Sequence, residues 1–173
     1  FAADVFGVLT TIRYSKNTIE TICKSLDNLN LCCAFISTPS LYFSVSPSVR
    51  KASKVFDFDT QWQHDPGYVH YDFNDPLNVP SDLHHTFDVA VIDPPFVTRD
   101  AWEKYSQTVR LLLKPHGKIV LTTLAENAPM MLELLNVRPT AFKPSIPHLV
   151  YQYDLYTNFD DVVFSVPNPE IPE

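Results

Sequence analysis

Apolar residues occur along this chain in two alternating patterns, one typical of buried strands and one typical of amphipathic helices. Short runs that are largely apolar predict strands at residues 31–37, 54–59, 68–74, 87–93 and 118–124. Two late extended segments cover residues 138–143 and 149–159. Because strands without a polar face are typical of sheets covered on both sides, we expect helices on both faces of one sheet.

Three segments have apolar residues at helical spacing and predict helices, at residues 15–29, 102–114 and 130–135. Ser15 or Asn17 is placed to cap the first helix. Asp100 and Glu103 have the spacing of a capping box for the second, in which Trp102 is expected to be a packing residue. Strands that alternate with helices and end in a pair of strands predict an α/β fold. Its sheet is doubly wound and carries a hairpin at one edge.

The length of 173 residues suits one domain with a substantial core. We expect this single domain to fill the chain, with a core over about residues 14–159. The tail, residues 160–173, is expected to be disordered or to lie along the surface. Because the first residue is Phe and not Met, we expect the natural N-terminus to lie upstream.

Cysteine and histidine usage indicates a reducing compartment and predicts no metal site. The three cysteines, Cys23, Cys32 and Cys33, are odd in number and lack CxxC spacing, and the last two are expected to be strand residues, one or both of them buried. His84 and His85 have no third ligand at metal-binding spacing. No run of about 18 apolar residues could span a membrane. We therefore expect a cytoplasmic protein.

Charge and glycine content narrow the choice of ligand. The net charge is -7 and the Lys and Arg residues are scattered, so nucleic acid is disfavoured and a basic protein partner is allowed. Glycine occurs only three times, and no GxGxxG phosphate loop is present. A standard dinucleotide-binding fingerprint is therefore excluded.

Polar residues collect where the predicted strands end, which is where ligands bind in open α/β sheets. The first strand ends in Ser37, Thr38, Pro39 and Ser40, and the next two end in Asp57 and Asp59 and in Asp72 and Phe73. A carboxylate after the second strand can accept both hydroxyl hydrogens of a ribose diol. A side chain at Asp72 or Phe73 could meet an adenine ring. Together these strand ends predict a cofactor cleft.

The fourth strand ends in Asp93, Pro94, Pro95 and Phe96. The prolines cannot donate to the sheet, so they end the strand, stiffen the backbone and leave carbonyl groups to accept hydrogen bonds. Asp93 adds a side-chain acceptor, and Phe96 adds a flat apolar face. This arrangement suits an amine, whose N–H groups are held while its lone pair points at an electrophile.

The tetrapeptide resembles motif IV of amino-group methyltransferases that use S-adenosylmethionine. Further stretches resemble one branch of these enzymes, in the same order along the chain: AFISTPSLY, FDFD, YDFNDPLNVP, FDVAVIDPPF and VYQYDLYTNF. This branch is the elongation factor 1-alpha lysine methyltransferases, formerly described as N6-adenine-specific DNA methyltransferases. The chain departs from it at Ile12 and Arg13, where the family carries aromatic residues.

The resemblance implies a Rossmann-like, seven-stranded class I methyltransferase sheet, mostly parallel with an antiparallel edge hairpin. It also implies a cofactor site made by Ser37 to Ser40, by Asp57 or Asp59 at the ribose, by Asp72 and Phe73 near the adenine, and by Asp93. Residues Asp93 to Phe96 would hold the acceptor amine. Three aromatic residues could form a cage for the substrate lysine: Tyr14, Phe96 and Tyr151.

The expected activity is methylation of a lysine of elongation factor 1-alpha by a monomeric enzyme. Two alternatives stay open. The tetrapeptide suits an adenine amino group of DNA or RNA equally well, although such an enzyme needs a basic groove. A non-catalytic subunit that binds a partner protein is the other alternative, and the departure at Ile12 and Arg13 motivates it.

Overall fold

The computed structural model describes residues 14–172, so Ile12 and Arg13 lie outside the described residues. One seven-stranded sheet has the order β3-β2-β1-β4-β5-β7-β6. The strands β3 to β5 pair in parallel, and β7 pairs antiparallel with both β5 and β6. The strands are β1 (Cys33–Ile36), β2 (Lys54–Asp57), β3 (Tyr68–His70), β4 (Phe87–Ile92), β5 (Leu113–Leu124), β6 (Arg138–Pro139) and β7 (Tyr153–Thr157). The predicted fold class is therefore confirmed, including the antiparallel edge.

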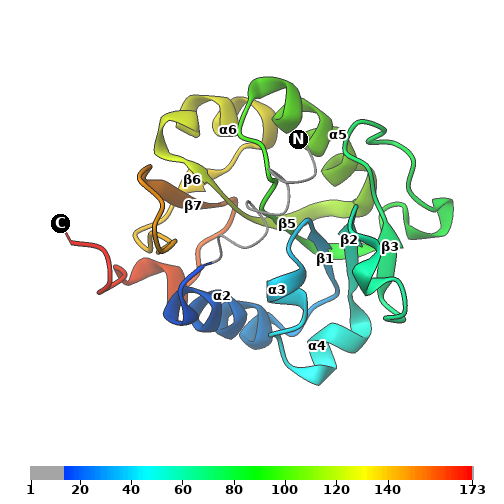
Figure 1. Ribbon diagram of the computed structural model, residues 1–173, viewed down its shortest axis with the longest axis horizontal. Helices are drawn as coiled ribbons and strands as arrows, with labels where there is room; N and C mark the ends of the chain where they lie inside the picture. The colour runs from blue at the N-terminus through cyan, green and yellow to red at the C-terminus, as the bar shows by residue number, and fades with distance from the viewer. Residues whose placement is uncertain (1–13, 173) are drawn as a thin grey trace.

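Helices cover both faces of the sheet (Figure 1). On one side lie α2 (Lys16–Leu29), α3 (Pro39–Tyr42) and α4 (Pro47–Ala52), and on the other lie α5 (Arg99–Leu112) and α6 (Ala128–Leu135). Successive residues of a strand point to opposite faces, so β1 contributes to two cores. Ala34 and Ile36 pack in the core of α5 and α6, whereas Cys33 and Phe35 pack in the core of α2. This alternation explains why β1 has no polar face.

The caps of the two long helices differ in how well the sequence predicted them. Ser15 caps α2 as expected, by accepting a hydrogen bond from the backbone of the first turn at 3.1 Å. The capping box predicted for α5 is wrong, because Thr98 caps that helix. The chain enters the helix soon after its double proline, so the Thr98 hydroxyl lies at the first turn. Asp100 and Glu103 form exposed ion pairs within the helix instead, with Lys104 and Arg99.

Several element boundaries also differ from the prediction. The short helices α3 and α4 were not predicted, although each begins at a proline, which is a preferred first helical residue. The strand β6 is only two residues long, and Pro139 has no N–H with which to extend its ladder. The predicted strand at 68–74 ends at His70, and the chain then turns at Asp72.

The C-terminal tail lies along the surface beside α2, the second of its two expected states (Figure 1). The Phe164 ring is buried and packs against Phe142, with 6.3 Å between the ring centroids. Asn168 is also buried, and its side chain bonds to the Lys143 carbonyl at 2.8 Å and to Asn17 at 3.1 Å. The tail therefore connects α2 to the segment that follows β6.

Two features are absent from the described residues: a helix that could span a membrane and a cluster of metal-binding side chains. Within residues 14–172, no helix combines the length and apolar character needed to cross a membrane. The same part of the chain holds no group of three or more His, Cys, Asp or Glu side chains that could bind a metal ion.

Candidate functional site

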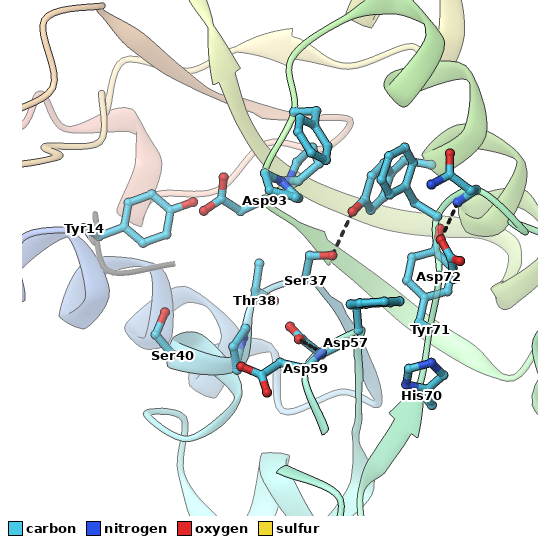
Figure 2. Close-up of a pocket in the computed structure, with 18 of the residues that line it drawn as sticks. Tyr14, Ser37, Thr38, Ser40, Asp57, Asp59, His70, Tyr71, Asp72 and Asp93 are labelled. Carbon is cyan, nitrogen blue, oxygen red and sulfur yellow. Dashed lines mark hydrogen bonds between the residues drawn. The ribbon is translucent and has the colours of Figure 1, made fainter. Parts of the chain in front are cut away.

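A cleft of about 690 Å³ opens at the carboxyl ends of β1 to β4. It has the size and position expected of a small-molecule site in an open α/β sheet. Every residue predicted to bind cofactor or to hold the acceptor amine lines it, and Figure 2 shows most of them converging from separate strands. Tyr14 also lines the cleft, whereas Tyr151 does not; its side chain is exposed outside it.

The turn after β1 forms one wall of the cleft. Ser37 has a left-handed backbone with φ of 59°, and its N–H donates to the Phe56 carbonyl at 2.8 Å. Its hydroxyl lies 2.9 Å from the hydroxyl of Tyr105 on α5, a contact drawn in Figure 2. Thr38 is buried and bonds to the Val91 carbonyl at 3.5 Å. The backbone of this turn is therefore held by groups from three other elements.

The two acids after β2 lie side by side on the cleft wall (Figure 2). Asp57 is the last residue of β2 and is buried, and its Oδ1 accepts from the backbone N–H of Asp59 at 2.8 Å. Asp59 accepts from the backbone N–H of Gln61 at 2.9 Å and caps a short 3₁₀ turn. Between them, Phe58 exposes about half of its side chain and presents an apolar ring to the cleft. Two carboxylates with a ring between them suit a polyol attached to a flat base.

The loop after β3 brings an acid and an aromatic ring to the same cleft. Asp72 Oδ1 accepts from the backbone N–H of Asn74 at 2.9 Å, which fixes the turn. Phe73 stacks on Tyr105, with 5.5 Å between centroids and 12° between planes. Phe73 also contacts Phe96, with 5.4 Å between the ring centroids. The aromatic contacts therefore join the loop after β3 to the loop after β4.

Asp93, Thr122 and Tyr14 form one hydrogen-bonded group. The Thr122 hydroxyl on β5 donates to Asp93 Oδ1 at 3.3 Å, and the hydroxyls of Tyr14 and Thr122 are 2.5 Å apart. Figure 2 shows the Tyr14 hydroxyl pointing toward the Asp93 carboxylate. The Tyr14 hydroxyl is also hydrogen-bonded directly to Asp93, and the phenol is the donor because a carboxylate only accepts. Tyr14, Thr122 and Asp93 therefore contact one another as a closed hydrogen-bonded group.

Two phenols near Asp93 stay protonated at neutral pH. Burial raises the pKa of Tyr14 well above its ordinary value, and the charge of Asp93 raises it further. Burial, followed by the charge of Asp93, raises the pKa of Tyr153 to about 12. Both phenols are therefore neutral hydrogen-bond donors beside a carboxylate.

The cleft residues that were missed from the sequence include three aromatic side chains: Phe58, Tyr105 and Tyr153. Tyr153 is the first residue of β7 and pairs with Leu124, so it shares a sheet face with Leu155 and its partner Thr122. Tyr151 has the same parity in the sequence, but the strand begins only at Tyr153, so parity alone could not choose between them. Phe58 could have been predicted to line the cleft, because it lies between two candidate acids in the sequence. Tyr105 could not, because its contact with Ser37 depends on how α5 packs on the sheet.

The described fold and sequence match a known group of enzymes. A family model described as "Probable N6-adenine methyltransferase" matches residues 13–161. EEF1A lysine methyltransferase 1 of Homo sapiens is 31% identical over 132 residues, which is 73% of this chain and 61% of that protein. The zebrafish (Danio rerio) protein of the same name is 29% identical over 165 residues, which is 88% of this chain and 97% of that protein. The chain thus spans about three fifths of the length of the human relative.

Solved structures show the same fold at low sequence identity. A methyltransferase of Leishmania major that depends on S-adenosylmethionine has a TM-score of 0.55 and 10% identity, over 90% of this chain and 81% of its own. The 1,6-didemethyltoxoflavin-N1-methyltransferase of Burkholderia thailandensis was solved with S-adenosylhomocysteine. It has a TM-score of 0.53 and 12% identity, over 81% of this chain and 76% of its own. The fold is therefore that of class I methyltransferases, and the chain belongs to the probable N6-adenine methyltransferase family.

Proposed function

We propose that this chain is an S-adenosylmethionine-dependent protein-lysine N-methyltransferase that acts on elongation factor 1-alpha. The observation that carries the proposal is the position of Asp93, Pro94, Pro95 and Phe96. They open onto the same cleft as the acids after β2. An acceptor site and a site for a ribose-bearing cofactor are thus continuous. Relatives named EEF1A lysine methyltransferase 1 support the choice of a lysine acceptor.

The cleft residues fit the cofactor in size and chemistry. Asp57 and Asp59 offer carboxylate oxygens for the ribose diol, and Phe58 offers an apolar face for the adenine. Asp72 and Phe73 lie in the next loop along the sheet, where they would bound the far side of the base. S-adenosylmethionine would supply a methyl group on a positively charged sulfur. We name Ser37, Asp57, Asp59 and Asp72 the cofactor wall.

The opposite wall would hold the lysine. We name Tyr14, Asp93, Phe96 and Tyr153 the acceptor wall, with Thr122 behind it. Asp93 and the Pro94 carbonyl would accept hydrogens of the amine and orient its lone pair. Lysine has a pKa of about 10.4 in water and must lose a proton before it can attack. The apolar face of Phe96 favours the neutral amine, and the proton leaves to water before the amine is buried.

A second acceptor, the amino group of adenine in nucleic acid, has one observation in its favour. The matching family model is described by that activity. The acidic chain, with a net charge of -7, offers few cations to bind a phosphate backbone. We therefore place protein lysine ahead of adenine.

The first test is calorimetric titration of the intact chain with S-adenosylmethionine. Labelled cofactor is then supplied with elongation factor 1-alpha in one reaction and with a short DNA duplex in another. The proposal expects saturable binding and label on the protein alone. Label on the DNA would establish the second acceptor, and binding without transfer to either would favour the non-catalytic alternative.

The setting of this activity is also a proposal. We infer that the enzyme works as a monomer in the cytoplasm, where translation elongation takes place. The three free cysteines suit a reducing compartment. Equilibrium sedimentation of the purified chain tests the oligomeric state.

A further inference from the structure

The turn after β1 uses a serine in a conformation that favours glycine. Ser37 has a φ of 59°, which is unfavourable for a residue with a Cβ. The turn from Ser37 to Ser40 contains no glycine, so its shape depends on contacts and not on an unhindered backbone. Hydrogen bonds from other elements to Ser37 therefore decide whether the turn keeps its shape.

Tyr105 supplies such a contact from a rigid position. It lies on α5, its side chain is 1% exposed, and its ring stacks on Phe73. Its hydroxyl is 2.9 Å from the Ser37 hydroxyl. Burial raises the pKa of Tyr105 far above its ordinary value, so the phenol keeps its proton. The contact is therefore a neutral hydrogen bond between a fixed ring and the strained residue.

We propose that Tyr105 is a positioning residue for cofactor binding, because its hydroxyl holds Ser37 in the left-handed conformation that glycine adopts unaided. This inference rests on the proposed function, since it assumes that the turn from Ser37 to Ser40 contacts the cofactor. Tyr105 also stacks on Phe73, which touches Phe96. The same side chain thus connects the cofactor wall to the aromatic ring on the acceptor side.

The first experiment uses the ligand-free chain, so it tests the contact whatever the cofactor is. Tyr105→Phe keeps the buried ring and removes the hydroxyl. Tyr156→Phe is the matched control: that tyrosine is also fully buried, and its hydroxyl bonds to the Leu124 carbonyl at 2.9 Å, away from the cleft. We expect the Ser37 amide to exchange with solvent about fivefold faster in Tyr105→Phe, as for loss of one hydrogen bond. The control should leave Ser37 exchange unchanged.

The second experiment separates a positioning role from general packing. Tyr105→Phe and Ser37→Ala should each weaken S-adenosylmethionine binding about three- to tenfold. Ser37→Gly should bind more tightly than Ser37→Ala, because glycine accepts this φ without support. Adding Tyr105→Phe to Ser37→Gly should then change little. Tyr156→Phe should bind like the parent.

Each contrary result has a distinct meaning. Equal Ser37 exchange in Tyr105→Phe and the parent would overturn the inference. So would a Ser37→Gly variant as weak as Ser37→Ala, because the serine hydroxyl would then act directly on the ligand. If the parent binds no S-adenosylmethionine, the proposed function fails, while the exchange result still decides whether Tyr105 holds the turn.

Discussion

The acids of the cofactor wall and the polar residues of the acceptor wall are held in place in different ways. On the cofactor wall, Asp57, Asp59 and Asp72 each accept a hydrogen bond from the backbone N–H two residues later. These are local contacts, made by short turns at the strand ends. On the acceptor wall, the Tyr14 hydroxyl meets a partner 108 residues away, and Thr122 reaches Asp93 across 29 residues.

This difference has a consequence for how each wall responds to change. Local turns set the cofactor-wall acids almost independently of one another, so single substitutions there should have separate effects. On the acceptor wall, Tyr14 and Asp93 form one hydrogen-bonded group with Thr122 behind them, so the loss of one member changes the others. Substitutions on the two walls should therefore separate cofactor affinity from turnover.

The largest expected effect is that of Asp93→Ala on turnover. Removing a preorganised hydrogen-bonding group costs roughly 10²–10³-fold in rate. We expect turnover on elongation factor 1-alpha to fall by about that factor or more, with cofactor affinity changed by less than about threefold. Labelled methyl transfer and calorimetry measure the two quantities.

The exposed Asp82→Ala is the control for Asp93→Ala, because Asp82 lies outside the cleft. It should leave both turnover and cofactor affinity unchanged. If Asp93→Ala kept full turnover, Asp93 would be only a turn residue and the acceptor wall would have no function.

The next effect distinguishes the two acids of the cofactor wall. Asp57 is buried at the end of β2, whereas Asp59 is more exposed and caps a turn. Asp57→Ala should weaken S-adenosylmethionine binding by about 10–100-fold, as for loss of charged hydrogen bonds. Asp59→Ala should cost about threefold, and calorimetry at one pH gives both values. The opposite order would assign the ribose to Asp59.

A smaller effect is expected behind the acceptor wall. Thr122→Val keeps the shape of the side chain but removes the hydroxyl that donates to Asp93 and contacts the Tyr14 hydroxyl. We expect turnover to fall about tenfold, in the range of one lost hydrogen bond in a connected set. Cofactor affinity should not change, and steady-state kinetics with each substrate varied shows the split.

Thr157→Val is the matched control for Thr122→Val. Thr157 is also buried, lies on the neighbouring strand β7 and bonds to the Phe159 carbonyl, away from the cleft. Equal effects of the two substitutions on turnover would show that Thr122 acts through stability alone.

The smallest effect concerns stability at high pH. Folding raises the pKa of Tyr153 from 10.0 to about 12 and that of Cys33 from 9.0 to about 12, in each case chiefly by burial. The folded chain therefore holds protons that the unfolded chain loses. The stabilisation is complete below about pH 9 and decreases as pH rises toward 12. Urea unfolding at several pH values measures the decrease, which Tyr153→Phe should reduce between pH 10 and 12.

The sequence predicted the cofactor wall better than the acceptor wall. Ser37, Asp57, Asp59 and Asp72 were predicted to share one cleft, and all four line it, because each lies at or after the end of an apolar strand and parallel strands end at the same edge. Tyr153 was missed in favour of Tyr151, because the position at which β7 begins depends on its pairing with β5. Tyr105 was missed because it is one of several apolar-face residues of α5, and helical spacing does not say which one meets the turn after β1.

By itself the sequence determined the class of fold, the two-sided burial of the sheet, and the edge at which the site lies. These three properties follow from the spacing of apolar residues within each segment and from the polar residues next to the strand ends. Only the tertiary structure decided that Thr98 caps α5, that the tail packs on α2, and that Tyr14, Thr122 and Asp93 form one hydrogen-bonded group. Those contacts join residues far apart in sequence, and their geometry depends on how the helices pack on the sheet.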